Sequence, residues 1–471
     1  MARTLITNGT VVTATDQVSA DVLIEDEKVV ALATPGSHDW SADETIDASG
    51  KYVIPGGLDV HTHMELPFGG TFASDTFETG TRAAAWGGTT TIVDFAVQAK
   101  GQGVLEGFET WMEKAAGNCA IDYGFHMIVG DVNEQSLKEM DSVMGEGVTS
   151  FKLFMAYPGV FYSNDGEIFR AMQKASEIGA TIMMHAENGI AIDVLVEQAL
   201  QRGETEPINH GLVRKSILEG EATHRAIKLA ELAGSPLYIV HMSALEALEE
   251  VTIARDQGLD VFAETCPQYL FLGLDDLGNG FEGAKYVASP PLRDWEAGHQ
   301  EELWRGLRSN DLQCVSTDHC PFCMDEFDGL IAQKRLGEGD FSKIPNGMPG
   351  VEPRMELMYE GGVAQGRISL NRWVEICSTA PAKMFGLYPQ KGAIAPGSDA
   401  DIVIFDPNKS RVISVDNQHM RVDYSAYEGT EVSGSVDTVL SRGRVVVASG
   451  EYHGEAGHGR YLPRGHNQYV L

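Results

Sequence analysis

The sequence predicts an α/β protein, a (β/α)8 TIM-like barrel with a small β-sandwich domain formed from the N- and C-terminal segments. Three observations predict this fold. Eight short apolar runs rich in Val, Ile and Phe are each followed by a helical stretch, the repeating unit of such a barrel. Both ends of the chain instead alternate apolar and polar residues, as strands do. The length of 471 residues suits one barrel of about 250 residues plus a smaller domain.

The two ends of the chain resemble each other. Residues 4–13 and 19–33 alternate as strands do and are separated by turn-forming residues, and residues 401–405 and 438–448 have the same character. We therefore expect these segments to fold together beside the barrel. The expected division is a first β-sandwich segment at 1–52, the (β/α)8 barrel at 53–388, a second β-sandwich segment at 389–452 and a C-terminal tail at 453–471.

The apolar runs between these ends mark the predicted barrel strands. They lie near residues 52–60, 90–97, 122–130, 150–156, 181–185, 237–241, 260–264 and 312–317. Two connections, 64–77 and 266–296, are long for a barrel, so we expect them to be active-site loops.

Composition excludes several classes of function. Asp and Glu number 68 and Lys and Arg 35, giving a net charge of −33, which repels phosphate backbones and anionic lipid. We therefore expect neither a nucleic-acid nor a membrane partner. No run approaches the roughly 18 apolar residues of a membrane span, and the N-terminus lacks the apolar stretch of a secretion signal. Six cysteines are too few for a disulfide scaffold, so we expect a cytoplasmic protein with reduced thiols.

Metal-ligating residue types stand where the predicted strands end, which is where barrel enzymes carry their chemistry. His61 and His63 are two apart on the first strand, so they share a face and can share one metal ion. The fourth, fifth, sixth and eighth strands contribute further residues: Lys152, His185, His241 and Asp318. Each alone has an ordinary explanation as a packed core residue or a lysine that reaches solvent. Their joint position at one rim favours a metal site.

This order of ligands resembles the binuclear amidohydrolase superfamily. Longer strings narrow the resemblance to its dihydropyrimidinase/hydantoinase branch, which hydrolyses cyclic amides and imides. They are GGLDVHTH, SFKLFMAYPGVF, ETCPQYLFL, SPPLRD, STDHCPF, IPNGMPGVEPRM and GSDADIVIFDP. The resemblance runs from about residue 3 to beyond residue 450.

The resemblance implies a cofactor of two divalent metal ions, with Zn²⁺ the expected species, bridged by N6-carboxylated Lys152. His61, His63 and Asp318 would hold the buried ion, and His185 and His241 would hold the other. Carboxylation needs a neutral amine, whereas a free lysine is protonated at neutral pH. Burial of Lys152 beside Phe151 and Phe154 would favour the neutral form.

The resemblance also assigns roles around the substrate. Asp318 would act as general base and then general acid, and the hydroxyl of Tyr157 would support the oxyanion. Ser289 and Asn346 match positions whose main chain binds the planar amide edge of the ring. An apolar gate around the ring substituent would involve Leu66, Phe154 and Phe161, although core packing explains these three nearly as well.

The function implied is metal-dependent hydrolysis of the cyclic amide bond of 5,6-dihydropyrimidines, 5-substituted hydantoins or both, giving N-carbamoyl amino acids. An allantoinase-like cyclic amidase is the alternative. A dihydroorotase is disfavoured, because residues 64–67 offer no arginine for a substrate carboxylate. Collapsin response mediator proteins look like this branch but have lost metal ligands, whereas all six are present here. The expected binding partner is therefore a small cyclic amide substrate. The resemblance also implies a homo-oligomer, either a tetramer or a dimer.

A few other residues stand out in the sequence but have no direct role in the implied function. Cys320 and Cys323 form a C-x-x-C sequence without a second cysteine pair, so we expect a packed, reduced loop. His319 should face away from the site. Glu187 and Asn188 should orient metal ligands from behind. The preferred substrate and its enantiomer stay open.

Overall fold

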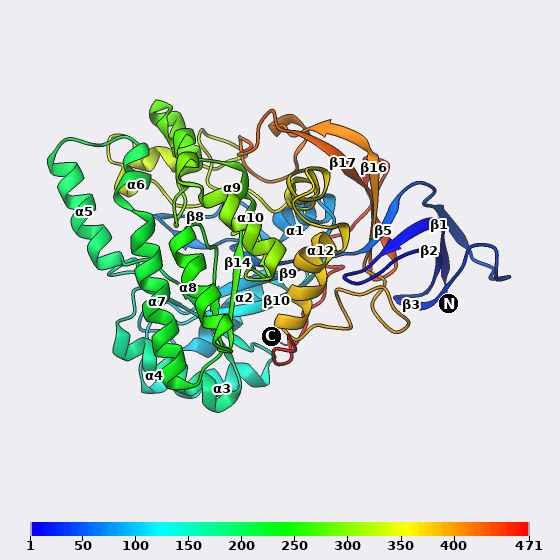
Figure 1. The fold of residues 1–471 in the computed structure, drawn as a ribbon, viewed down its shortest axis with the longest axis horizontal. Helices are drawn as coiled ribbons and strands as arrows, with labels where there is room; N and C mark the ends of the chain where they lie inside the picture. The colour runs from blue at the N-terminus through cyan, green and yellow to red at the C-terminus, as the bar shows by residue number, and fades with distance from the viewer. Residues whose placement is uncertain (1, 470–471) are drawn as a thin grey trace.

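The computed structural model describes residues 2–469 and contains a barrel with a smaller β domain at one end (Figure 1). Residue 1 of the predicted segment 1–52 and residues 470–471 of the predicted tail lie outside the described residues. Among residues 2–469, every helix is too short or too polar to cross a membrane.

The barrel sheet has eight parallel strands within the described chain, paired in the order in which they occur in the sequence. They are β6 Gly57–Thr62, β9 Thr89–Val97, β10 Asp122–Ile128, β11 Ser150–Phe154, β12 Thr181–His185, β13 Leu237–Ile239, β14 Val261–Thr265 and β15 Cys314–Val315. A parallel bridge between Thr62 and His319 joins the last strand segment to the first. The predicted barrel is confirmed, and its strands are buried along their whole length, as parallel strands covered by helices must be.

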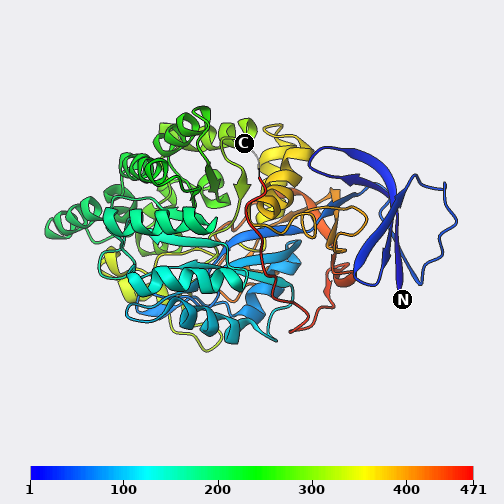
Figure 2. The ribbon, with the colours of Figure 1, turned by 90° about the horizontal axis from the view of Figure 1, so that it is seen from below.

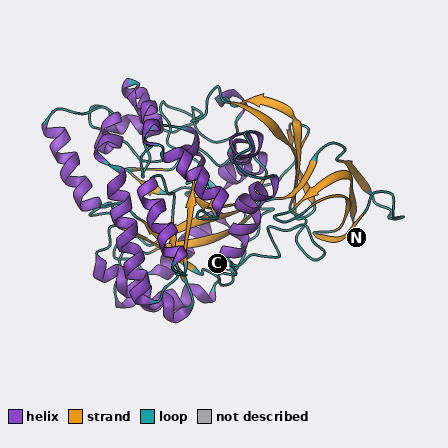
Figure 3. Ribbon diagram, in the orientation of Figure 1, coloured by secondary structure: helices purple, strands orange, loops and turns teal. Residues whose placement is uncertain are grey.

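Helices cover the outside of the barrel (Figures 2 and 3). The longer ones are α1 Phe77–Trp86, α2 Val104–Ala115, α3 Glu134–Gly145, α4 Asp165–Ile178, α5 Gly189–Gln201, α7 Ser216–Ala233, α8 Leu245–Asp256 and α10 His299–Ser309. Shorter ones are α6 Ile208–Val213, α9 Pro267–Phe271, α11 Arg354–Met358, α12 Leu370–Val374 and α13 Ala380–Met384. Local sequence sets their limits: Asn164 and Glu167 form a capping box at the start of α4, and Gly179 ends it in the left-handed conformation.

Several loops contain a short 3-10 helix. These are η1 Leu274–Gly278, η2 Gly280–Tyr286, η3 Trp295–Ala297, η4 Gln333–Gly337, η5 Phe341–Lys343 and η8 Val415–Asn417. Two π-helical segments lie within longer helices: η6 Tyr359–Ala364 continues α11, and η7 Glu375–Thr379 joins α12 to α13.

The two ends of the chain build the β domain together. Its strands are β1 Arg3–Val12, β2 Gln17–Glu25, β3 Lys28–Ala33, β4 Glu44–Asp47, β5 Tyr52–Pro55, β16 Ile402–Val412, β17 Glu431–Ser441, β18 Arg444–Ala448 and β19 Glu451–Tyr452. Eight of them follow one hydrogen-bonded path in which β5 pairs with β1 on one side and with β16 on the other, and β4 pairs with β1 beside this path. The path encloses a separate apolar core that includes Ile6, Val22, Val53, Ile404 and Leu440.

A buried ion cluster ties the β domain to the barrel. The Lys391 ammonium lies 2.6 Å from Asp122 at the start of β10, 2.7 Å from Asp401 and 3.0 Å from Asp399. These three carboxylates lower the energy of the buried charge by pairing with it. The division of the chain at residues 52, 388 and 452 stays a prediction.

The described residues of the C-terminal tail pack on their own barrel (Figure 2). Leu462 donates its backbone N–H to the Tyr123 carbonyl, and the buried Arg464 guanidinium donates to Ser150 at 2.8 Å. These contacts hold residues 460–464 against β10 and β11 of the same chain.

Two short strands form a hairpin at the rim of the barrel where the parallel strands end. They are β7 Pro67–Phe68 and β8 Thr71–Phe72, in the predicted loop 64–77. This loop and the predicted loop 266–296 both reach the pocket described next.

Candidate active site

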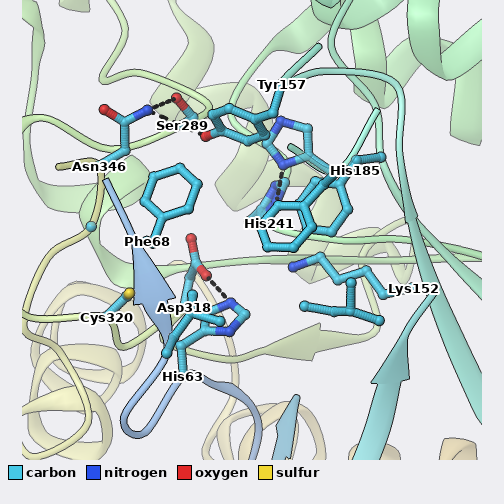
Figure 4. Close-up of a pocket in the computed structure, with 15 residues that line it drawn as sticks. His63, Phe68, Lys152, Tyr157, His185, His241, Ser289, Asp318, Cys320 and Asn346 are labelled. Atoms are coloured by element: carbon cyan, nitrogen blue, oxygen red, sulfur yellow. Dashed lines mark hydrogen bonds and ion pairs between the residues drawn. The ribbon is translucent and has the colours of Figure 1, made fainter. Parts of the chain in front are cut away.

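One pocket opens where the barrel strands end, and it collects nearly every residue that the sequence singled out (Figure 4). It is lined by His63, Leu66, Phe68, Ile128, Lys152, Phe154, Tyr157, Phe161, His185, His241, Ser289, Asp318, Cys320, Asn346 and Gly347. His61 is absent from this lining because it lies fully buried beneath the floor.

The floor of the pocket holds a cluster of two imidazoles and a carboxylate. Both Nε2 atoms of His61 and His63 lie 3.1 Å from Oδ1 of Asp318. One ligand atom from each of the three residues falls within 4.8 Å of the others, which is close enough to share an ion. Asp318 has a φ of 51°, a left-handed backbone that turns its carboxylate toward the histidines of β6.

Lys152 projects from β11 between the two groups of histidines (Figure 4). Its Nζ lies 2.9 Å from His61 Nε2 and 4.3 Å from the centre of the Phe95 ring. Burial lowers the pKa of Lys152 to about 8, against the opposing pull of Asp318 and Glu264. At pH 7 roughly one amine in ten is then neutral, far more than in a free lysine. Phe154 lies 5.0 Å from Nζ as predicted, and Phe95 is the second aromatic contact.

His185 and His241 form the second pair of imidazoles. His185 Nδ1 lies 2.9 Å from His241 Nε2, and His185 Nε2 lies 2.8 Å from Glu187. Burial lowers the pKa of His241 well below its usual range and that of His63 to about 3, so both rings are neutral. Neutral imidazoles are the form that binds metal ions.

Glu264 is a central residue that the sequence analysis missed. It is the penultimate residue of β14 and is completely buried. It accepts hydrogen bonds from His61 Nδ1, from the Tyr238 hydroxyl at 2.8 Å and from the His241 backbone N–H at 3.1 Å. It therefore holds one histidine of each pair. The feature that could have pointed to it is an acidic residue near the end of the otherwise apolar strand Val261–Thr265.

Asp59 has a similar role between the first and last strands, and it was also overlooked as a site residue. Its carboxylate accepts from the Thr317 hydroxyl at 2.5 Å, from the Thr317 N–H at 3.2 Å and from the His61 N–H at 3.3 Å. These bonds fix the segment before Asp318 against the strand that carries His61 and His63.

Tyr157, Ser289 and Asn346 meet across the upper wall (Figure 4). The Asn346 side-chain amide donates to the Ser289 hydroxyl at 3.1 Å and to the Tyr157 hydroxyl at 3.3 Å. Burial raises the pKa of Tyr157 to about 12, so its hydroxyl keeps a proton to donate. Within residues 2–469, the Ser289 N–H and C=O and the Asn346 C=O have no hydrogen-bond partner. These three groups are free to bind a ligand.

Aromatic side chains form the apolar mouth. The Phe154 and Phe161 rings stack with centroids 5.0 Å apart, and Leu66 lines the same space. Phe68, on the β7–β8 hairpin, stacks 6.3 Å from Phe161 and meets Tyr157 edge-on at 5.2 Å. The sequence analysis did not single out Phe68, because position in a long loop does not indicate where a side chain points.

The remaining predictions near the site have mixed outcomes. Glu187 orients His185, as expected, but Asn188 instead caps α5 by accepting from the Ala191 N–H at 3.1 Å. His319 faces away and pairs with Asp75 at 2.9 Å. Cys320 and Cys323 are buried free thiols, and burial raises both pKa values, that of Cys323 to about 12.

The donor set fits two divalent ions. Two ring nitrogens that face each other at 2.9 Å, in His185 and His241, need a shared proton or a cation between them. The far nitrogens of His61 and His185 each contact a carboxylate, Glu264 and Glu187, an arrangement that orients metal-binding histidines. Imidazole and carboxylate donors suit zinc and similar ions.

Comparisons with known proteins agree with this geometry. Residues 52–446 match the model of the amidohydrolase family. The chain is 66% identical over 473 residues to a D-hydantoinase of Streptomyces coelicolor, covering 100% of this chain and 99% of that protein. It is 51% identical to a D-hydantoinase of Geobacillus stearothermophilus, covering 98% of this chain and 96% of that one. The crystal structure of a dihydropyrimidinase from Brevibacillus agri superposes with a TM-score of 0.95 at 50% identity, covering 99% of this chain and 100% of that one.

Proposed function

The chain belongs to the amidohydrolase family and is a hydrolase of cyclic amides, and from this premise we propose how its site opens the ring. The substrates are 5-substituted hydantoins and 5,6-dihydropyrimidines, and the products are N-carbamoyl amino acids. One observation carries the proposal: six candidate metal ligands converge below the free backbone groups of the loops that carry Ser289 and Asn346. They are His61, His63, Lys152, His185, His241 and Asp318.

Two divalent ions, zinc in our proposal, would supply a polarised ring carbonyl and an activated water molecule when bound. His61, His63 and Asp318 would hold one ion, His185 and His241 would hold the other, and N6-carboxylated Lys152 would be a ligand of both. The depressed pKa of Lys152 and its contacts with Phe95 and Phe154 support a neutral amine that can react with carbon dioxide. The amine forms a bond to carbon and loses a proton, which leaves a carbamate.

Proton transfer falls to Asp318. Its carboxylate lies at the centre of the floor, 3.1 Å from both His61 and His63, and these histidines keep its pKa well below the usual range despite burial. Asp318 accepts the proton of the attacking water and delivers it to the leaving ring nitrogen. The Tyr157 hydroxyl donates to the oxygen on which negative charge develops.

Substrate orientation comes from backbone. A planar –CO–NH–CO– edge presents acceptor, donor and acceptor in a row. The Ser289 N–H can donate to a ring carbonyl, and the Ser289 and Asn346 carbonyls can accept from ring N–H groups, because all three lack partners within residues 2–469. Backbone groups suit this task, since the fold fixes their direction.

The aromatic mouth supports the acceptance of apolar ring substituents. Leu66, Phe68, Phe154 and Phe161 surround the space beyond the amide edge. An aryl group at the 5-position would bury apolar surface there, whereas dihydrouracil would leave it unfilled. Catalytic efficiencies for dihydrouracil and for both enantiomers of phenylhydantoin would rank these substrates.

The experiment that tests the function is ring opening by the zinc-loaded protein. We expect release of an N-carbamoyl amino acid from hydantoin and dihydrouracil, loss of activity with a strong chelator, and recovery when zinc and bicarbonate are returned. Absence of turnover on both rings, with allantoin hydrolysed instead, would favour the allantoinase alternative. Absence of turnover and of bound metal would favour an interaction protein.

We also propose a homo-oligomer, a tetramer or dimer, in the cytoplasm. Ile190 and Val194 on α5 and Leu212 on the neighbouring α6 are about half exposed, which is costly in a lone subunit. The six cysteines are free thiols, as a reducing compartment keeps them. Light scattering on the eluting protein would give the subunit number.

A further inference from the structure

Lys334 is a buried lysine that the proposed chemistry does not use. It belongs to η4, its exposed fraction is 0%, and its Nζ donates to the carbonyls of Val287 at 3.1 Å, Pro345 at 2.8 Å and Gly347 at 2.8 Å. An ammonium group has three N–H donors, so each donor has one acceptor. No carboxylate within residues 2–469 pairs with this charge. An apolar side chain of similar volume would avoid the cost of burying it.

The three carbonyls belong to the two loops that form the amide-binding wall. Val287 precedes Ser289 by two residues, and Pro345 and Gly347 stand on either side of Asn346. The Gly347 N–H also donates to the Val287 carbonyl at 2.9 Å, so the loops are joined at the point where Lys334 reaches them. Lys334 therefore fixes the spacing between Ser289 and Asn346.

The hydrogen bond from the Gly347 N–H to the Val287 carbonyl also sets the direction of the Asn346 carbonyl. In a trans peptide the N–H and C=O point in opposite directions. The Gly347 N–H points to Val287, so the Asn346 carbonyl in the same peptide unit points away from Val287. Pro345 and Gly347 turn their carbonyls to Lys334, and Asn346 and Gly347 line the pocket. The partnerless Asn346 carbonyl is thus left for a ligand.

The side chain of the preceding residue, Gln333, links η4 to the β7–β8 hairpin at the aromatic mouth of the pocket. The Gln333 amide donates to the Thr71 hydroxyl at 2.9 Å and to the Phe72 carbonyl at 2.5 Å. These acceptors lie on β8, the hairpin strand that pairs with Phe68. Successive residues of η4 thus hold the aromatic mouth and the amide-binding wall.

We propose that Lys334 is a positioning residue that holds the Asn346 carbonyl where it accepts the N–H of the substrate's –CO–NH–CO– edge. The proposal rests on the proposed function, because it assumes that cyclic imides are the ligands. Lys334 itself touches no substrate. Its loss should weaken recognition of the imide N–H without affecting the ion ligands.

The test compares Lys334→Met with a matched control, Lys343→Met, whose lysine side chain is 70% exposed on the same loop. Two ligands are used with the zinc-loaded enzymes: dihydrouracil, and its analogue methylated at the imide nitrogen, tested as an inhibitor. Loss of one well-placed hydrogen bond should raise KM for dihydrouracil about tenfold in Lys334→Met. The inhibition constant of the methylated analogue, which cannot make that bond, should change by less than about twofold. The control and the zinc content should match the wild type.

Two results would overturn the proposal. One is a KM for dihydrouracil that stays within twofold of the wild type in Lys334→Met. The other is a proportional rise of KM and of the analogue's inhibition constant, because general loosening of the pocket moves both. Lys334→Gln is measured in parallel, since it keeps two N–H donors in the core should the methionine variant fail to fold; a smaller selective rise in KM is expected. A wild-type protein that opens neither dihydrouracil nor hydantoin refutes the proposed function instead.

Discussion

Replacing Glu264 with glutamine should weaken metal binding while leaving the fold intact. Glu264 contacts His61 Nδ1 and the His241 N–H through Oε1 and the Tyr238 hydroxyl through Oε2. A glutamine can place its carbonyl oxygen at Oε1 and its NH2 group beside the Tyr238 oxygen, so the contacts survive and only the charge is lost. The charge makes His61 a better ligand, and comparable partners are worth about 10- to 100-fold in metal affinity. That range equals about 1.4 to 2.7 kcal/mol.

The assay is competition for zinc with a chelator of known affinity, combined with thermal unfolding of the metal-free protein. Glu264→Gln should bind zinc about 10- to 100-fold more weakly, with an unfolding midpoint close to that of the wild type. Glu296→Gln, a surface change in η3, is the matched control. Zinc affinity within twofold of the wild type would refute the reasoning. A large fall in the unfolding midpoint would show instead that Glu264 acts mainly as a core contact.

Three further predictions concern other walls of the site. Tyr157→Phe should lower kcat about 100- to 1,000-fold with little change in KM, since it removes an oxyanion donor, and a purely KM effect in steady-state kinetics would contradict that role. Phe68→Ala should reduce kcat/KM for phenylhydantoin more than for dihydrouracil, and equal losses would show that Phe68 does not contact the substituent. Reactivation of metal-free protein by zinc at fixed dissolved carbon dioxide should speed up as pH rises and level off above about 9, because most Lys152 amines, with a pKa lowered to about 8, are then neutral. A rate still rising at pH 10 would contradict the lowered pKa.

The barrel and its candidate metal ligands could be predicted from the sequence, because parallel barrel strands all end at the same rim. His61, His63, His185, His241 and Asp318 end or follow an apolar run, and Lys152 lies within one. Period-two geometry already places His61 and His63 on one face. The family resemblance supplied Tyr157, Ser289 and Asn346. The structure brings all nine together around one pocket.

Other residues could not be predicted because their roles depend on contacts between distant segments. Glu264 lies 203 residues from its partner His61, and a single carboxylate in an apolar strand has no spacing to reveal it. Lys334 resembles any loop lysine until its three carbonyl partners are seen. Asn188 illustrates the opposite error, because proximity to His185 in sequence suggested ligand support where the side chain caps a helix.

The central claim is a binuclear site bridged by carboxylated Lys152, and zinc content tests it most directly. Wild type and Lys152→Ala would be grown with zinc and bicarbonate, desalted, and measured by plasma emission. The account predicts about two zinc ions per wild-type chain and fewer than one per Lys152→Ala chain, because the carbamate is the ligand that both ions share. Two ions retained by Lys152→Ala, or well under one in the wild type, would contradict it.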